Sequence, residues 1–142
     1  MNILNEMKLS FPSKSCNEAF ARAAVAAFVM NLDPTVEELS DLKTAVSEAV
    51  TNSIVHGYRR SGGMIYITGR ISENGRVVVK IRDKGCGIED VRQAMEPLFT
   101  TAPEEERAGL GFAVMQSFCD RVKVSSTPGK GTTVTLEKTL GA

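Results

Sequence analysis

The chain alternates between two hydrophobic patterns, one repeating every two residues and one repeating every three to four. The first is typical of a strand buried on one face, and the second is typical of an amphipathic helix. The first pattern predicts strands at residues 1–11, 64–72, 76–82, 121–126 and 132–138. The second predicts helices at residues 17–31, 35–58, 88–95 and 109–119. This order predicts an α+β, two-layer sandwich in which helices cover one face of a mixed, mostly antiparallel sheet.

Local signals mark where several of these elements begin and end. Ser15 or Asn17 is expected to cap the first helix, and Thr35 with Glu38 forms the capping-box pattern at the start of the second. The pair Asn74-Gly75, between two strand-like stretches, is the strongest short signal for a β-hairpin. Residues 96–108 have little periodicity and high charge, so they predict a loop long enough to need a functional explanation.

Composition and charge narrow the class of protein. The 142 residues suit one ordinary domain, so residues 1–142 are expected to form a single unit. Lys plus Arg equals Asp plus Glu at 17 each, which argues against direct nucleic-acid binding and against electrostatic attachment to a membrane. No apolar run reaches the roughly 18 residues of a spanning helix, and the first residues lack a secretion-signal pattern. A cytoplasmic location is therefore expected.

The residues most often found in redox or transition-metal sites are few. Cys16, Cys86 and Cys119 are an odd number without CxxC spacing, so they predict neither a disulfide framework nor a zinc site. His56 is the single histidine and lies near the end of the second predicted helix, where we expect it to have a structural role. Other residue types must therefore carry the chemistry of this chain.

The first motif with chemical content lies on the second predicted helix. Glu48 and Asn52 are four residues apart, so their side chains share one face of that helix. An amide oxygen such as that of Asn52 is a hard, neutral ligand suited to Mg²⁺. The Glu48 carboxylate can take the proton from a hydroxyl or water that attacks a metal-bound phosphate. A solvated polar stripe on a helix has the same spacing, and the motif alone does not distinguish the two.

Two glycine motifs follow later in the chain. Asp83 ends a predicted strand and precedes Gly85 and Gly87, where the missing side chains let the backbone approach a ligand. A buried carboxylate at Asp83 can accept a hydrogen bond from the exocyclic amine of adenine. Gly109 and Gly111 open a predicted helix, whose first N–H groups favour phosphate. Taken alone, the Asp83-x-Gly-x-Gly motif also fits an ordinary turn. The Gly109-x-Gly111 motif also fits a glycine-rich start of a helix.

Two further residues are candidates for contacts with a nucleotide. Arg107 lies two residues before Gly109, and its charge suits either a γ-phosphate or an ion pair with the acidic run at 104–106. Thr132 begins the last predicted strand, from which its hydroxyl can reach the edge of a base. Threonine is also common in strands for its β-branched shape, so Thr132 has a structural interpretation as well.

In combination, the order Glu-x-x-x-Asn, Asp-x-Gly-x-Gly and Gly-x-Gly resembles the GHKL ATP-binding superfamily, which includes gyrase, Hsp90, histidine kinases and MutL. The resemblance covers nearly the whole chain. The sequences at 47–52, 56–58 and 96–101 resemble the serine-kinase anti-sigma factors, and most closely their branch in sporulating Gram-positive bacteria. Phe20-Ala21-Arg22 and the break at Leu32-Asp33-Pro34 are similar to that branch as well.

The resemblance implies a role for each matching residue. Asn52 would ligate Mg²⁺, Glu48 would be the general base, and Asp83 would recognise adenine. Arg107 would contact the γ-phosphate and the protein substrate as part of the catalytic machinery, and Arg22 would lie on the partner-binding surface. The remaining ATP-binding residues that it implies are Gly85, Gly87, Thr100, Thr101, Gly109, Gly111 and Thr132.

The resemblance also implies an activity and a set of partners. The chain would bind ATP and Mg²⁺, hold a sigma-F-like sporulation sigma factor inactive, and phosphorylate a serine of an anti-anti-sigma factor, leaving ADP. The family is homodimeric. A general-stress anti-sigma kinase of the same family would have an identical pocket. A binding module that uses ATP only as a conformational ligand would bind nucleotide without transferring phosphate, and the presence of Glu48 disfavours it.

Overall fold

The computed structural model describes residues 2–96 and 111–141. Its helices and strands, in chain order, are β1 (Ile3–Pro12), α1 (Asn17–Val29), α2 (Val36–Asn52), β2 (Met64–Ser72), β3 (Arg76–Asp83), α3 (Val91–Ala94), α4 (Gly111–Phe118), β4 (Arg121–Thr127) and β5 (Gly131–Thr139). Two 3-10 turns, Met30–Leu32 and Glu73–Gly75, and a π-helical turn, Ser53–Gly57, lie between them. None of the helices in these ranges is both long enough and apolar enough to cross a bilayer.

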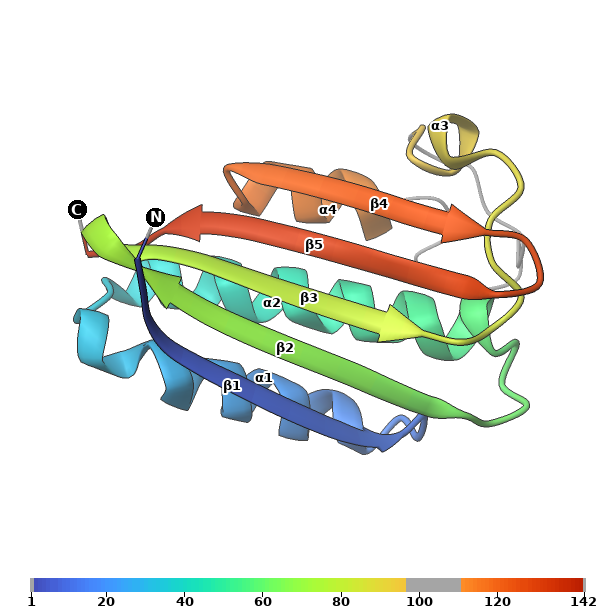
Figure 1. Ribbon diagram of the computed structural model, residues 1–142, viewed down its shortest axis with the longest axis horizontal. Coiled ribbons are helices and arrows are strands. Elements are labelled where there is room, and N and C mark those ends of the chain that lie inside the picture. Colours follow the sequence, from blue (N-terminus) through green and yellow to red (C-terminus); the bar gives the residue numbers. More distant parts are fainter. Residues whose placement is uncertain (1, 97–110, 142) are drawn as a thin grey trace.

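The five strands form one sheet in the order β1-β2-β3-β5-β4, and each of these neighbouring pairs is antiparallel. Helices α1, α2 and α4 lie together behind the sheet, so its other face is open (Figure 1). Helix α1 packs against β1 and β2, α2 against β3 and β5, and α4 against α2 and β4. The predicted α+β sandwich is therefore confirmed.

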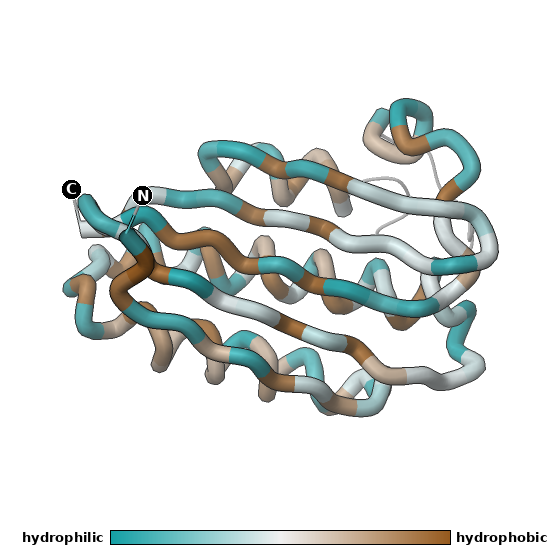
Figure 2. The backbone as a smooth tube through the Cα atoms, in the orientation of Figure 1, coloured by the Kyte–Doolittle hydropathy of each residue, from teal (hydrophilic) through white to brown (hydrophobic). Residues whose placement is uncertain are grey.

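The hydrophobic core fills the space between the sheet and the helices. Inward-facing aliphatic residues such as Ile67 and Val79 are almost completely buried, and they belong to one hydrophobic cluster with helix residues such as Val25. Hydrophobic positions recur along both layers (Figure 2). Burying each such side chain contributes about 1.5–3 kcal/mol. The core therefore fixes α2 on β3 and β5, the elements that carry most of the predicted site residues.

The capping signals were partly correct. At the start of α2 the Thr35 hydroxyl accepts from Glu38 N–H at 3.0 Å, and the Glu38 carboxylate accepts from Thr35 N–H at 2.8 Å, so the capping box is confirmed. The predicted side-chain cap of α1 is wrong, because Cys16 takes the cap position without a side-chain bond. The Asn17 amide instead donates to the carbonyl of Pro12 at 2.9 Å, where it ties the helix start to the end of β1.

The second predicted helix does not run unbroken to residue 58. Helix α2 ends at Asn52, and the next turn is π-helical, with Tyr58 N–H donating to the Ser53 carbonyl at 2.8 Å. Such a turn holds one extra residue and is frequent at functional sites. Here it places Ser53 and Gly57 against the end of β3, which uniform helical periodicity does not anticipate.

The other boundaries follow the predictions with small shifts. The hairpin between β2 and β3 turns at Asn74 and Gly75, with φ of 64° and 74°. The predicted helix at 88–95 is shorter, because Asp90 caps it by accepting from Gln93 N–H at 3.0 Å. Most of the predicted loop at 96–108, together with residues 109 and 110, lies outside the described residues.

Candidate functional site

Apart from Arg22, the predicted site residues within the described ranges lie where the layer of helices meets the sheet. Helix α2 carries Glu48 and Asn52, and the end of β3 carries Asp83. The start of β5 pairs with that end of β3, through the register match of Asp83 with Thr132. Helix α4 packs beside α2 and begins at Gly111. Residues spread over more than eighty positions of sequence therefore meet around one helix.

Asp83 is the buried acid of this site, with 2% of its surface exposed. Its Oδ1 accepts a hydrogen bond from Gly85 N–H at 2.9 Å. Burial raises the pKa of Asp83 above its ordinary value, and hydrogen bonds from Gly85, from the Ser53 hydroxyl and from the Thr132 backbone offset part of this increase. A buried carboxylate with a shifted pKa is typical of a functional site. The Asp83 carboxylate is therefore suited to accept a hydrogen bond from a polar group of a ligand.

Glycines surround Asp83 closely. A Cβ atom on Gly57 would lie 2.7 Å from Asp83 Oδ2, and one on Gly85 or Gly131 would overlap a backbone carbonyl of the neighbouring segment. Cys86 N–H donates to the Gly57 carbonyl at 2.8 Å, which joins the loop after β3 to the π-helical turn. Backbone from three segments therefore closes around the carboxylate.

Gly87 and Thr132 connect the loop after β3 to the turn between β4 and β5. Thr132 is 4% exposed, and its hydroxyl oxygen lies 2.8 Å from Ser126 Oγ. The same Ser126 oxygen accepts from Ile88 N–H at 2.7 Å. Gly87 has φ of 76°, a left-handed conformation that favours glycine. The Asp83-x-Gly-x-Gly segment thus contacts the π-helical turn on one side and the turn between β4 and β5 on the other.

Glu48 and Asn52 lie one turn apart near the end of α2, as their spacing predicted. Glu48 is 4% exposed, whereas Asn52 is half-buried. A Cβ atom on Gly111 would lie 3.5 Å from Glu48 Oε2, so α4 begins directly beside this carboxylate. The first N–H groups of a helix attract anions. A carboxylate, an amide and a helix start therefore share one side of α2.

A separate polar network joins α1 to the same stretch of α2. Arg22 donates through Nη1 to Glu18 Oε1 at 3.1 Å and to Ser47 Oγ at 2.9 Å. The Thr51 hydroxyl donates to Glu18 Oε2 at 2.7 Å. Ser47 and Thr51 directly precede the two site residues of α2. Arg22, which keeps 36% of its side chain exposed, therefore links the surface of α1 to that stretch.

Four predicted site residues, Thr100, Thr101, Arg107 and Gly109, lie outside the described residues. Across 2–96 and 111–141, no group of three His, Cys, Asp or Glu side chains is arranged to hold a metal ion. The described part of the site thus consists of Asp83 with its glycines and of Glu48 with Asn52 and Gly111.

Sequence reasoning missed three residues of the site. Ser53 bonds to Asp83 through its hydroxyl, and Gly57 leaves space for that carboxylate. Tyr58 donates its hydroxyl to the Met64 carbonyl and accepts from Lys84 N–H at 2.8 Å, which fixes the loop after β3. The resemblance at 56–58 included Gly57 and Tyr58 without giving either a role, and Ser53 offered only a polar side chain just after Asn52.

Replacing Tyr58 with Phe removes both hydrogen bonds while keeping the ring. Burial raises the pKa of the Tyr58 hydroxyl, so it is protonated and able to donate at neutral pH. We expect Y58F to lower the free energy of unfolding by about 1–2 kcal/mol, as measured by urea denaturation. The control is Y66F, because Tyr66 lies on the face of the sheet that points away from the helices. The Phe ring of this variant keeps the contact with Lys84 Nζ, which lies 5.1 Å from the ring centroid. An equal free energy of unfolding in Y58F and Y66F would contradict this structural role of Tyr58.

Comparison with known proteins places this geometry in a family. Residues 11–138 match the histidine kinase-like ATPase domain family. The chain is 57% identical over 142 residues to the anti-sigma F factor of Thermoanaerobacter sp., an alignment that covers 100% of this chain and 99% of the relative. It is also 57% identical over 141 residues to the anti-sigma F factor of Caldanaerobacter subterraneus subsp. tengcongensis, with coverage of 99% and 98%.

Among solved structures, the chain is similar to the crystal structure of the RsbU and RsbW domains of a Mycobacterium tuberculosis protein. The TM-score is 0.67 and the sequence identity is 16%, with coverage of 96% of this chain and 32% of that one. At this identity the similarity concerns the fold. It agrees with the sheet and the helical layer described above.

Proposed function

Because the chain belongs to the anti-sigma F factor family of histidine kinase-like ATPases, we propose that it holds a sporulation sigma factor inactive and phosphorylates a serine of an anti-anti-sigma factor. The observation that carries this proposal is the joint placement of Asp83, Glu48, Asn52 and the start of α4 around one helix. An adenine acceptor, a phosphate-attracting helix start and a base are the parts that an ATP-dependent kinase needs.

The described residues fit a bound adenine nucleotide. Asp83 is buried among backbone segments that leave no space for side chains, so its carboxylate suits a flat, polar group such as the amine edge of adenine. Thr132 lies beside it in the strand register and would support the same edge. Gly85 and Gly87 would shape the loop that covers the base.

Glu48 and Asn52 fit the phosphate end of the nucleotide. Asn52 would bind Mg²⁺ through its amide oxygen, with phosphate oxygens and water as the other ligands, which is the usual arrangement for this ion. Bound Mg·ATP would supply the transferable phosphoryl group and the charge that neutralises it. Glu48 would accept the proton of the attacking serine hydroxyl, and Gly111 leaves space beside it.

The remaining assignments rest on the family resemblance. Arg107 would contact the γ-phosphate and the protein substrate, while Thr100, Thr101 and Gly109 would complete the phosphate site. We further propose that residues 1–142 act as one domain, that the chain forms a homodimer, and that it works in the cytoplasm without binding nucleic acid or membrane directly.

A phosphotransfer assay tests the proposed activity. The protein is mixed with labelled Mg·ATP and a purified anti-anti-sigma factor, and the labelled residue is mapped by mass spectrometry. Label on one serine is the expected result. An unlabelled partner, with ATP binding demonstrated by calorimetry, would instead support a module that binds ATP without transferring phosphate.

Arg22 provides a test of the partner-binding surface. We expect R22A to weaken binding of the purified sigma factor by about 30-fold, because an arginine at the centre of an interface is often worth 2 kcal/mol or more. The measurement is calorimetric titration in the presence of Mg·ATP. The matched control is K14A, which removes an exposed cation just before α1. Unchanged affinity of R22A for the sigma factor would mean that the binding surface does not include this part of α1.

A further inference from the structure

Ser126 is a polar residue beside the proposed adenine site to which the family resemblance gives no role. It lies near the end of β4, in register with Thr132 of β5, and Thr132 is in register with Asp83 of β3. Residues in register on antiparallel strands point to the same face of a sheet. Asp83 bonds to Ser53 of the helical layer, so all three side chains face the helices. The ends of three strands therefore place a polar row next to the buried carboxylate.

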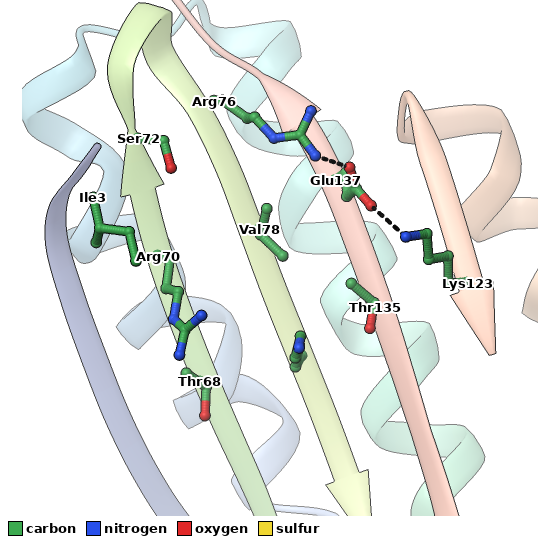
Figure 3. A pocket seen from close by; sticks show the side chains of 10 residues that line it. Ile3, Thr68, Arg70, Ser72, Arg76, Val78, Lys123, Thr135 and Glu137 are labelled. Atoms are coloured by element: carbon green, nitrogen blue, oxygen red, sulfur yellow. Dashed lines mark hydrogen bonds and ion pairs between the residues drawn. The ribbon is translucent and has the colours of Figure 1, made fainter. Parts of the chain in front are cut away.

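The opposite face of the same strands carries different side chains. On that face the ammonium of Lys123 on β4 lies 3.8 Å from the carboxylate of Glu137 on β5 (Figure 3). Side chains alternate between the two faces along a strand. Ser125 therefore shares the face of Lys123, while Ser126 lies on the helix side. Ser125 is thus a neighbour of identical chemistry, separated from the adenine site by the sheet.

The Ser126 hydroxyl has three partners, and together they determine the direction of each hydrogen bond. Its oxygen accepts from Ile88 N–H at 2.7 Å. It lies 3.0 Å from the carbonyl oxygen of Gly131 and 2.8 Å from the hydroxyl oxygen of Thr132. A carbonyl only accepts, and a serine hydroxyl has a single proton to donate. All three bonds are therefore made together only when Ser126 donates to Gly131 and Thr132 donates to Ser126.

This direction limits what Thr132 can offer to a ligand. Its one hydroxyl proton is used on Ser126, so its oxygen has only acceptor capacity left. The ionised carboxylate of Asp83, its neighbour in the register, is also an acceptor. Two neighbouring acceptors match a base edge that presents an amine, as adenine does. They repel the carbonyl oxygen that guanine and hypoxanthine present at the same ring position.

We propose that Ser126 is a positioning residue for nucleotide selection, which takes the proton of Thr132 and so keeps two acceptors directed at the base. The proposal rests on the adenine site of the proposed function and adds to it a residue that contacts the base only through Thr132. Without the Ser126 hydroxyl, that of Thr132 is free to turn and donate to a carbonyl. Discrimination against purines with a carbonyl at this position then falls.

The bond to Ile88 gives Ser126 a second, purely structural effect, which has a different outcome. Ile88 follows the Asp83-x-Gly-x-Gly segment directly, so losing this bond would loosen the loop around the adenine site. A looser loop weakens the binding of all purine nucleotides alike. A turned Thr132 hydroxyl instead changes the ratio of the affinities for an amine and for a carbonyl. This ratio therefore separates the two effects.

The test measures the affinities for Mg·ATP and Mg·ITP by calorimetric titration. The hypoxanthine base of ITP has a carbonyl oxygen in place of the adenine amine and a proton on the adjacent ring nitrogen. We expect the unaltered chain to favour ATP, and S126A to lower the ratio of ATP to ITP affinity by about tenfold. S126T keeps the hydroxyl and should retain most of this preference. The control S125A should leave the ratio unchanged.

A double-mutant cycle with T132V tests whether Ser126 acts through Thr132. Valine keeps the shape of threonine without its hydroxyl, and T132V leaves the bond between Ser126 and Ile88 in place. T132V should lower the ratio by itself, and S126A should not lower it further in the T132V background. Because T132V does not disturb the loop contact, its lowered ratio tests the role of the Thr132 hydroxyl even if S126A fails to fold.

Three results would overturn the proposal. An unchanged ratio in S126A, with both affinities reduced alike, would leave Ser126 with the loop contact only. A fall of equal size in S126A with and without T132V would mean that Ser126 does not act through Thr132. An unaltered chain that binds neither nucleotide, or binds both equally, would overturn the adenine site itself and this inference with it.

Discussion

Replacing Glu48 with Gln should slow phosphoryl transfer to the partner serine by roughly 10²–10⁴-fold, while ATP still binds. The carboxylate is 4% exposed and stands beside the start of α4, where the attacking hydroxyl would have to deliver its proton. Glutamine keeps the size and the polarity of the side chain but cannot accept that proton. The loss should therefore appear in the rate of a single turnover at saturating Mg·ATP.

The matched control is E37Q, an exposed carboxylate in the first turn of the same helix. It makes the same chemical change on α2 far from the site, so its transfer rate should equal that of the unaltered chain. Normal turnover in E48Q would remove Glu48 from the reaction. Loss of ATP binding in E48Q would instead assign it a role in holding the nucleotide.

The second large effect is expected for Asp83. We expect D83N to weaken ATP binding by about 10- to 150-fold, because a hydrogen bond to a charged group is worth about 1.5–3 kcal/mol. The asparagine amide would also present N–H groups to neighbours that themselves donate, including the Gly85 N–H and the Ser53 hydroxyl. Calorimetric titration with Mg·ATP measures the change.

The pH dependence of binding provides an independent check on Asp83. Burial raises the pKa of this carboxyl, so on acidification it takes up a proton at a higher pH than an ordinary aspartate does. The protonated form is no longer a charged acceptor. ATP affinity should therefore fall as the pH drops through the raised pKa of Asp83, and D83N should lack this step.

The same raised pKa determines the sign of the effect on stability. A carboxyl whose folded-state pKa is raised contributes stability below its unfolded pKa, and this contribution is lost as the pH rises through the folded value. At neutral pH the charged Asp83 therefore costs stability, and D83N removes this cost. The Asn amide would face the Gly85 N–H and the Ser53 hydroxyl, which acts in the opposite direction, so the melting temperature of D83N should stay close to that of the unaltered chain. The control is D33N, an exposed residue in the left-handed conformation that asparagine tolerates. A clear fall in melting temperature for D83N alone would mean that Asp83 supports the fold and is not reserved for a ligand.

Much of the architecture could be predicted from local sequence. Alternation gave the strands, helical spacing gave α1 and α2, and the Thr35–Glu38 and Asn74-Gly75 signals set two boundaries. These features depend on backbone periodicity and on contacts within a few residues. The side-chain cap of α1 and the unbroken second helix were wrong because distant partners decided them, namely the end of β1 and the end of β3.

The sequence by itself determined which chemical groups this protein has and how they are spaced along each element. Glu48 and Asn52 share a helix face through a four-residue spacing, and Asp83 precedes its two glycines whatever the rest of the chain does. Only the tertiary structure decided that the Ser53 hydroxyl meets Asp83, that Gly111 lies beside Glu48, and that the Ser126 hydroxyl meets the N–H of Ile88. Those contacts join segments far apart in the sequence, and they exist because the core fixes how the helices sit on the sheet and how its strands are ordered.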